Sequence, residues 1–163
     1  MTLPEFFRKQ KETGRKRTEE VFALLRPEHM TWTPGNGALS IGEMLRHLWV
    51  SEEGVRRVAL DGDFAYYEKR VPGGLAAVLG SPAKSLDDEL RQIKRVHEET
   101  LAAVEKLPEA AWDEERTHAG LGFRRKVSVI LFGINEHEVH HRAQLMTYLR
   151  MLGTPAPEPF GRR

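Results

Sequence analysis

Residues 127–152 read VSVILFGINEHEVHHRAQLMTYLRML, and their apolar positions recur at helical spacing. Steps of three and four residues connect one stripe along this segment, made of Ile130, Ile134, His137, His141, Leu145, Tyr148 and Leu152. Gly153 and Pro155 follow as stop signals. The segment is therefore predicted to be a long helix, from about Val127 to Leu152, with one face turned into a core.

Three earlier segments show the same kind of periodicity and are also predicted to be helices. They run from about Leu3 to Leu25, Ser40 to Asp61 and Ser85 to Leu107. The second and third open with capping pairs, in which Ser40 precedes Glu43 and Ser85 precedes Asp88.

Two connections differ from the helices in composition. The stretch from Asp61 to Pro82 is rich in glycine and proline, so we expect a long crossover with at most short helical turns, of the kind that often borders a site. The stretch from Glu109 to Lys126 is polar and turn-like, with Trp112, Leu121 and Phe123 as expected anchors on the core. The economical architecture is all-α, a four-helix bundle with a long crossover between helices two and three. A length of 163 residues favours one domain over 1–163.

Composition excludes several classes of function. The 25 Lys and Arg residues oppose 24 Asp and Glu residues, which argues against a nucleic-acid partner. The chain has no cysteine, so a metal would have to bind His, Asp or Glu, and any thiol would come from outside. The longest nearly apolar run, Val127 to Ile134, is far shorter than the roughly 20 residues that span a bilayer, so no membrane partner and a cytoplasmic location are expected.

Histidines interrupt the apolar stripe of the last helix. His137 and His141 lie one turn apart, where an imidazole is costly to bury unless both ring nitrogens find partners. A divalent cation would satisfy both rings at once, whereas backbone carbonyls or water would satisfy them as ordinary core histidines. His140 is expected to face solvent or a partner.

Two further histidines lie on predicted helices. His47 lies at the margin of the second helix's apolar stripe, where it can complete a three-histidine site if that helix neighbours the fourth. His97 lies on the third helix's stripe, either as a fourth ligand or as a buried histidine bonded to a neighbouring helix. His29 and His118 fall in turn regions and are given no role.

Two sequence motifs carry a family resemblance. They are Leu45-Arg46-His47-Leu48, and the run from Glu136 to Leu145 with Tyr148-Leu149-Arg150 and Gly153. In these the chain resembles the DinB/YfiT-like family of four-helix bundles with a three-histidine divalent metal site. The resemblance implies His47, His137 and His141 as ligands, and a metal-dependent enzyme related to members that transfer low-molecular-weight thiols or isomerise with a thiol cofactor. Ala143 departs from the family, which often has glycine there.

An open three-histidine site could ionise water or a thiol, and imidazole ligands suit zinc, nickel or iron. Together with the absence of cysteine, the family resemblance thus implies a thiol S-transferase or related hydrolase, acting on a small-molecule substrate with a low-molecular-weight thiol as cosubstrate, and this is the favoured hypothesis. Side chains that could orient the ligands are Glu52, Glu136 and Gln144, each otherwise a solvated helix residue. Tyr148 could present its hydroxyl to a substrate or simply belong to the core. The run Arg124-Arg125-Lys126 could attract an anionic substrate or be a solvated cluster.

Two other hypotheses stay open. One is a non-catalytic, stress-related metal-binding bundle protein whose site His97 closes, and the other is a metal-free bundle that acts through contacts. A homodimer of about 37 kDa, twice the chain mass of 18.6 kDa, is also expected. Its basis is the apolar side chains at the edges of the predicted helix faces, namely Phe6, Phe7, Phe132 and Leu149, together with the dimers that the family resemblance implies.

Overall fold

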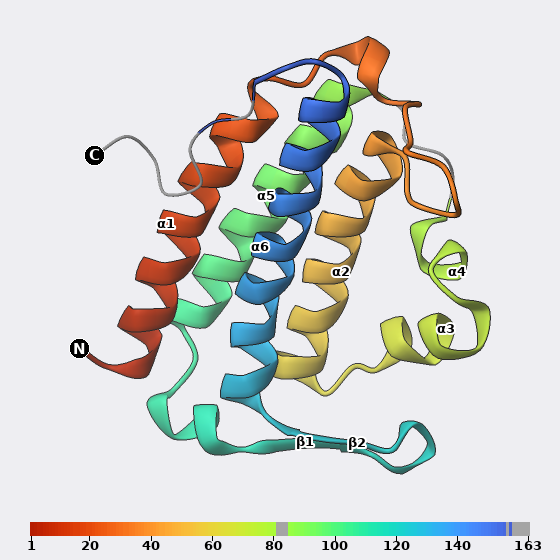
Figure 1. Ribbon diagram of the computed structural model, residues 1–163. Coiled ribbons are helices and arrows are strands. Elements are labelled where there is room, and N and C mark those ends of the chain that lie inside the picture. Colours follow the sequence, from red (N-terminus) through yellow and green to blue (C-terminus); the bar gives the residue numbers. More distant parts are fainter. Residues whose placement is uncertain (81–84, 156, 158–163) are drawn as a thin grey trace.

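The computed structural model describes residues 1–80, 85–155 and 157. Four long helices form a bundle: α1 (Leu3–Phe22), α2 (Ile41–Asp61), α5 (Leu86–Glu105) and α6 (Val127–Met151) (Figure 1). The crossover carries two short helices, α3 (Ala65–Gly73) and α4 (Ala76–Leu79). The predicted all-α four-helix bundle is confirmed.

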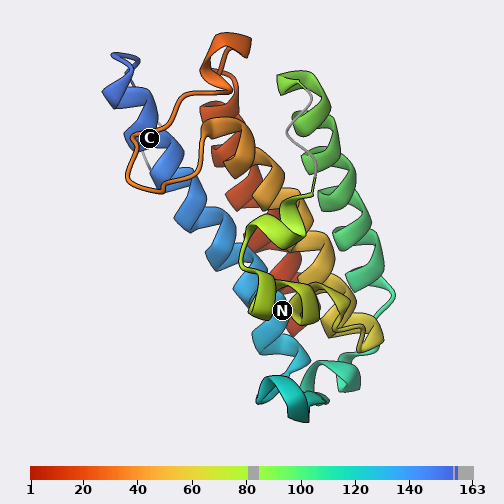
Figure 2. The same cartoon turned by 90° about the vertical axis from the view of Figure 1, so that its right-hand side faces the viewer.

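The order of helices around the bundle explains the long crossover. Helix α2 packs against α5 and α6, and α1 packs against the same two helices. In Figure 1, α1 and α6 run in one direction along the bundle, whereas α2 and α5 run in the other. Because α2 and α5 are parallel neighbours, the chain between them must return along the bundle's length. On that return, α3 and α4 lie against α2 (Figure 2).

The predicted capping residues fix the helix ends. The Glu43 amide donates to Ser40 Oγ at 3.3 Å, and the Ser40 amide donates to Glu43 Oε2 at 2.8 Å. At the other end of α2, Gly62 adopts φ 67°, a left-handed conformation that glycine adopts without strain. The Asp88 amide donates to Ser85 Oγ at 3.1 Å and so caps α5 as predicted.

The interior contains two apolar clusters rather than one continuous core. The first joins the end of α1 to the start of α2 and the end of α6, with the members Val21, Phe22, Leu45, Leu48, Ile93, Leu145 and Leu149 among others. The second joins the opposite ends of these helices, with Phe7, Val58, Val104, Trp112, Leu131 and Ile134 among others. Between them lie buried polar side chains of α1, α2 and α6, namely Lys11, Arg15, His47, Ser51, Glu52, Glu138 and His141. This polar layer holds the candidate site.

Both connections contain more regular structure than predicted. The polar stretch before α6 forms an antiparallel hairpin of β1 (Glu115–His118) and β2 (Phe123–Lys126), because paired strands satisfy backbone groups that a plain turn would leave to water. The anchor Trp112 is confirmed, with 1% of its surface exposed. Helix α3 is longer than the short turns expected, and residues 81 and 82 of the predicted crossover lie outside the described residues.

Several apolar side chains that were predicted to lie at the edge of the bundle are buried or partly buried in the structure. Phe7 and Leu149, predicted to lie at the bundle's edge, are fully buried with 0% exposure, because each belongs to one of the two apolar clusters. Phe6 is 38% exposed and Phe132 is partly buried against it.

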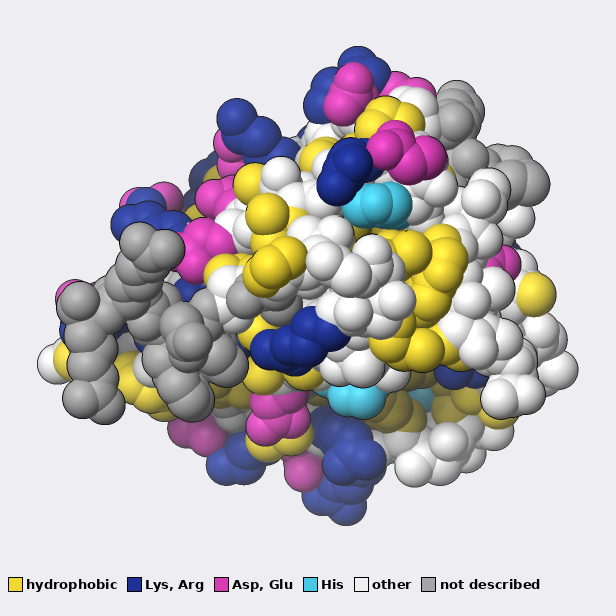
Figure 3. All heavy atoms as spheres, turned by 45° about the horizontal axis from the view of Figure 1, so that its top comes forward, with side chains coloured by type: hydrophobic (Ala, Val, Ile, Leu, Met, Phe, Trp, Pro, Cys, Tyr) yellow, Lys and Arg dark blue, Asp and Glu magenta, His cyan; other side chains and the backbone are white. Residues whose placement is uncertain are grey.

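Charges are mixed over the molecule's surface. On the face shown in Figure 3, Lys and Arg side chains are interspersed with Asp and Glu side chains, in keeping with the formal net charge of +1. Within the described residues, no helix combines the length and the apolar character that a bilayer crossing requires.

Candidate metal centre

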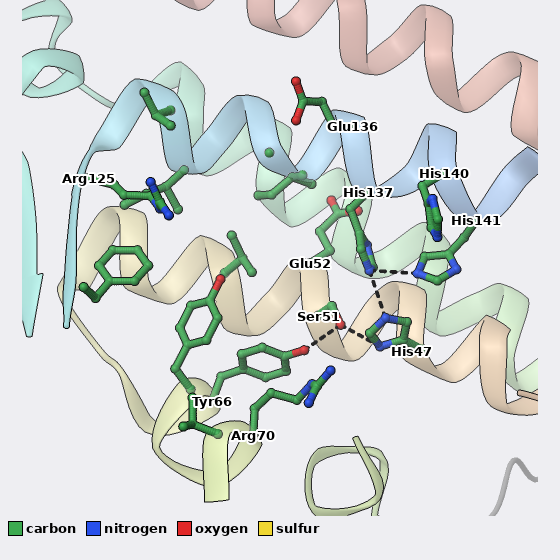
Figure 4. Close-up of a pocket in the computed structure, with 18 residues that line it drawn as sticks. His47, Ser51, Glu52, Tyr66, Arg70, Arg125, Glu136, His137, His140 and His141 are labelled. Atoms are coloured by element: carbon green, nitrogen blue, oxygen red, sulfur yellow. Dashed lines mark hydrogen bonds between the residues drawn. The ribbon is translucent and has the colours of Figure 1, made fainter. Parts of the chain in front are cut away.

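Three histidines from two helices converge on one point. Helix α2 presents His47, and its neighbour α6 presents His137 and His141 from successive turns (Figure 4). The Nε2 atom of His137 lies 2.9 Å from Nε2 of His47 and 3.0 Å from Nε2 of His141. One ligand atom of each of the three rings falls within 4.8 Å of the others. The structure thus brings together the three histidines that the sequence singled out.

This geometry fits ligands of one metal ion. Two nitrogens that each lie about 2.1 Å from a shared cation, at roughly a right angle, are about 3 Å apart. Hydrogen bonding accounts for the arrangement less well, because His137 Nε2 carries at most one proton and can aim it at only one neighbour. The group could therefore hold a divalent cation.

Neighbouring side chains fix two of the rings from behind. His141 Nδ1 donates to the side-chain oxygen Oε1 of Gln144 at 2.7 Å, which leaves Nε2 of that neutral ring unprotonated and facing the other two rings. His47 Nδ1 lies 2.9 Å from Ser51 Oγ, which in turn lies 2.8 Å from the Tyr66 hydroxyl. The prediction that Gln144 orients a ligand is consistent with the first contact.

Burial keeps the three rings neutral. It is the main cause that lowers the pKa of His47 to about 4 and that of His137 to about 3, and the charges of neighbouring histidines add to it. Burial also lowers the pKa of His141, although the hydrogen bond to Gln144 opposes the shift. Neutral imidazoles are the form that binds metals.

A buried ionic cluster, made of Lys11, Arg15, Glu52 and Glu138, lies next to the histidines in the bundle interior. Lys11 Nζ, on α1, lies 2.8 Å from Glu52 Oε2 and 3.3 Å from Glu138 Oε2. Arg15, one turn further along, reaches the same two oxygens at 3.4 Å and 2.9 Å. Burial by itself raises the pKa of Glu138, but the charges of Lys11 and Arg15 lower it to about 2. Since Glu138 follows His137 and Glu52 lies in the same helix as His47, this cluster ties both ligand-bearing helices to α1.

Two other histidines of the bundle helices, His97 and His140, are not part of the three-histidine group. His97, proposed as a fourth ligand, is outside the three-histidine group, and its surroundings are the charges of Lys11, Arg15, Glu52 and Glu138. His97 thus lies beside the ionic cluster rather than at the point where the three rings converge. His140 is exposed, as expected, with its ring 4.9 Å from that of His141.

Two further side chains can be placed by their contacts. Tyr148 packs edge-on against Trp32, with ring centroids 5.2 Å apart, and is buried. Of its two predicted roles, the structure therefore shows that of a core residue. Glu136 is exposed, and in Figure 4 its carboxylate points away from His137.

The three rings lie at the wall of a cavity of about 920 Å³. Its lining comes from α2, α3, β2 and α6 and includes Val55, Tyr67, Phe123, Ile130 and Ile134 as apolar groups. This volume is at the upper end of the range of roughly 300–1,000 Å³ that is typical of small-molecule sites. A ligand of that size could therefore reach the open side of the histidine group.

Comparison with known proteins agrees with the fold and the motif. The family model of the DinB superfamily matches residues 10–145. This chain belongs to the DinB superfamily. Among DinB-like relatives, YjoA of Bacillus subtilis (strain 168) is 25% identical over 139 residues, which cover 83% of this chain and 82% of YjoA.

Two DinB-like crystal structures share the fold. That of YjoA from Bacillus subtilis superposes with a TM-score of 0.73 at 22% identity and covers 96% of this chain and 99% of its own. That of a DinB-like protein from Bacillus cereus ATCC 10987 gives a TM-score of 0.71 at 17% identity, over 94% and 95% of the two chains.

Sequence reasoning missed several groups around the site of this DinB-superfamily chain. Ser51 follows His47 by four residues, a spacing that places both on one helix face and could have identified it. Tyr66 and Arg70 lie in α3, within the crossover that was expected only to border a site. Lys11 and Arg15 gave no signal, because a charged helix face is usually solvated.

Proposed function

We propose that this protein is a metal-dependent enzyme that transfers a small-molecule thiol to an organic substrate, or hydrolyses such a substrate. His47, His137 and His141 hold one divalent cation at the wall of the cavity, and imidazole ligands suit zinc, nickel and iron. The observation that carries the proposal is the convergence of three neutral imidazoles on one point beside a cavity large enough for a substrate.

The chain's own residues explain why the site would be catalytic rather than structural. Since His97 is outside the three-histidine group and lies beside the ionic cluster, no fourth histidine of the described residues closes the group. Three ligands and an open side are typical of catalytic sites. When bound, such a cation supplies Lewis acidity and ionises a coordinated water or thiol near neutral pH. The thiol would be a separate small molecule, because the chain has no cysteine.

The protein's own residues position the metal ligands and line the cavity with apolar groups. Gln144 and Ser51 hold His141 and His47 with their Nε2 atoms turned toward the shared point. The ionic cluster keeps α1, α2 and α6 in register behind the rings. The apolar wall of the cavity lowers the local dielectric, which strengthens electrostatic interactions with a bound substrate.

The first experiment measures metal content by elemental analysis of protein purified without a histidine tag. We expect about one equivalent of a divalent metal in the wild type, and a loss of most of it in His47→Ala, His137→Ala and His141→Ala. The helical content should change little, since both apolar clusters remain. His140→Ala is the matched control and should keep its metal. Full occupancy in any of the three ligand variants would contradict the assignment.

The second experiment tests the reaction. Metal-loaded protein is given a low-molecular-weight thiol with a chromogenic electrophile, and separately a chromogenic ester. Turnover of either substrate that disappears in His137→Ala but persists in His140→Ala would support the enzyme. Stoichiometric metal without turnover in either assay would favour the alternative of a non-catalytic metal-binding protein.

A further inference from the structure

Helix α3 presents two hydrogen-bond donors to the cavity. Tyr66 and Arg70 are four residues apart, so they share one face of α3, and both line the cavity. In Figure 4 the guanidinium of Arg70 reaches toward His47, and the Tyr66 hydroxyl contacts Ser51. Arg70 is half-buried, yet it forms no ion pair with any carboxylate in the described part of the chain.

The acidic side chains that line the same cavity are not placed to pair with Arg70. Glu52 is buried and bonded to Lys11 and Arg15. Glu136 is exposed, with its carboxylate directed away from the histidines in Figure 4. The cavity therefore holds a guanidinium that none of the carboxylates among the described residues neutralises.

The position of this guanidinium is electrostatically unfavourable for a cation site. Burial is the main reason that the pKa of His47 is lowered, and the charge of Arg70 contributes to the same shift, so the two groups sense each other. A divalent cation on the three histidines would likewise be repelled by Arg70. An anionic group between them would be attracted by both charges and would remove the repulsion.

Tyr66 contributes a donor at the same place. If His47 binds a cation through Nε2, its proton is on Nδ1 and is donated to Ser51 Oγ. Ser51 then donates its own proton to the Tyr66 oxygen at 2.8 Å. The Tyr66 proton is left free, so it can be donated to a ligand oxygen beside Arg70.

We propose that Arg70 and Tyr66 bind the acidic group of a small organic anion, a carboxylate or a phosphate, as the substrate of the three-histidine site. The inference rests on the proposed function, since the direction of the hydrogen bonds from His47 to Tyr66 follows from metal binding. The apolar body of the substrate lies along the wall formed by Val55, Ile130 and Ile134.

The hairpin supplies a second, weaker cation at the far end of the cavity. In the run Arg124-Arg125-Lys126, Arg124 pairs with Glu115 and Lys126 pairs with Asp113, whereas Arg125 lines the cavity over the ring of Phe123. In Figure 4, Arg125 lies well away from the histidines. Because Arg125 is exposed, solvent and salt screen its charge, and its contribution to anion binding should be smaller than that of Arg70.

The test uses isothermal titration calorimetry on the metal-loaded full chain, after the metal content of each sample has been measured. The probes are 4-phenylbutyrate, its uncharged amide and 3-phenylpropylphosphonate. We expect both anions to bind the wild type at least about tenfold more tightly than the amide, a factor that corresponds to about 1.4 kcal/mol. Binding of one anion alone would also support the proposal and would identify the acid.

Variants then separate Arg70 from the metal as the source of that preference. Arg70→Gln should lose most of the tenfold preference at unchanged metal content, and Tyr66→Phe should lose part of it. Arg150→Gln, an exposed arginine at the end of α6 and outside the cavity lining, is the control and should bind like the wild type.

Two results would overturn the inference, and a third separates it from the proposed function. Arg70→Gln that binds the anions as tightly as the wild type would overturn it, and so would a larger loss in Arg125→Gln than in Arg70→Gln. Anion binding that depends on Arg70 in a protein that takes up no metal would support Arg70 as the anion site, while the proposed metal enzyme would fail.

Discussion

At the level of single residues, buried charges distinguish this bundle from one with a purely apolar interior. Lys11 is 1% exposed, and Glu52 and Glu138 are 5% and 4% exposed. Each such charge would be strongly unfavourable alone, and the group is tolerated because two cations face two carboxylates at hydrogen-bonding distance. Removing one partner leaves an uncompensated charge inside the bundle.

The substitution Lys11→Met tests this compensation. It should lower the free energy of unfolding by about 3–5 kcal/mol, because Glu52 and Glu138 would then share Arg15 alone. Urea denaturation measures the change. Lys16→Met, at an exposed position of the same helix, is the control and should stay within about 0.5 kcal/mol of the wild type. Equal stability of the two variants would show that the ionic cluster is dispensable.

His97 is predicted to make stability depend on pH. Burial, with the charges of Arg15 and Lys11, lowers its pKa from 6.5 to about 4, and its Nδ1 has no hydrogen-bond partner within the described structure. The unfolded chain therefore takes up a proton below pH 6.5 that the folded chain accepts only near pH 4. The stability that His97 contributes is fully present above pH 6.5 and is lost as the pH falls toward 4.

The variant His97→Gln isolates this contribution. In chelator, the unfolding free energy of the wild type should fall between pH 6.5 and 4 by about 1.4 kcal/mol per pH unit more steeply than that of His97→Gln. The other buried histidines titrate in both proteins, so their effect cancels in the comparison. Parallel curves from urea denaturation at several pH values would contradict the prediction.

At the level of elements, one glycine decides how closely the crossover approaches the bundle. A Cβ at Gly54 of α2 would lie 2.4 Å from Cγ of Tyr66, at the stem of that ring. Gly54 thus lets α3 dock on α2 closely enough for Tyr66 to reach Ser51. At Gly133, in α6 and also at the cavity, such a Cβ would meet no atom within 4 Å apart from the neighbouring residues and backbone of its own helix.

The pair Gly54→Ala and Gly133→Ala is a matched test of this docking. Both gain helix propensity, by about 1 kcal/mol. Gly133→Ala should therefore be as stable as the wild type or more so, whereas Gly54→Ala should lose about 1–3 kcal/mol through the displaced ring. Backbone amide hydrogen exchange in α3 should also be faster in Gly54→Ala than in the wild type, and it should be unchanged in Gly133→Ala. Unchanged exchange in Gly54→Ala would mean that α3 does not depend on Gly54.

At the level of the whole molecule, assembly as a homodimer stays a prediction, although two of the four apolar side chains that suggested it are buried in the core. Phe7 and Leu149 are core residues, and the large apolar side chains left exposed on α1 and α6 are Leu3, Phe6, Val129, Val139 and Met151, with exposures of 42%, 38%, 54%, 47% and 59%. Phe6 and Val139 line a common groove between these helices. A second copy of the chain would cover this face.

Light scattering on purified protein tests the assembly. We expect a mass of about 37 kDa, twice the chain mass of 18.6 kDa. Val139→Glu should shift the mass toward the monomer, because it places a charge in the predicted interface, whereas Val71→Glu on α3 should not. A mass near 18.6 kDa at all concentrations of the wild type would contradict the dimer.

The sequence by itself determined the four long helices of the bundle and singled out the three histidines. Capping pairs and glycines mark helix ends through local backbone hydrogen bonds, and the steps of three and four residues that carry His137 and His141 depend only on helix geometry. For the same reason the bundle could be predicted, since four amphipathic helices must bury their faces against one another.

Tertiary structure alone decided what surrounds those histidines. His47 meets His137 because α2 packs against α6. His97 lies outside the group, and its neighbours are the charges of Lys11 and Arg15. No periodicity distinguishes a buried lysine from a solvated one, because its burial is tolerated only when carboxylates from other helices arrive beside it. The placement of Arg70 at the cavity likewise follows from the docking of α3 on α2, a contact between elements that local sequence does not encode.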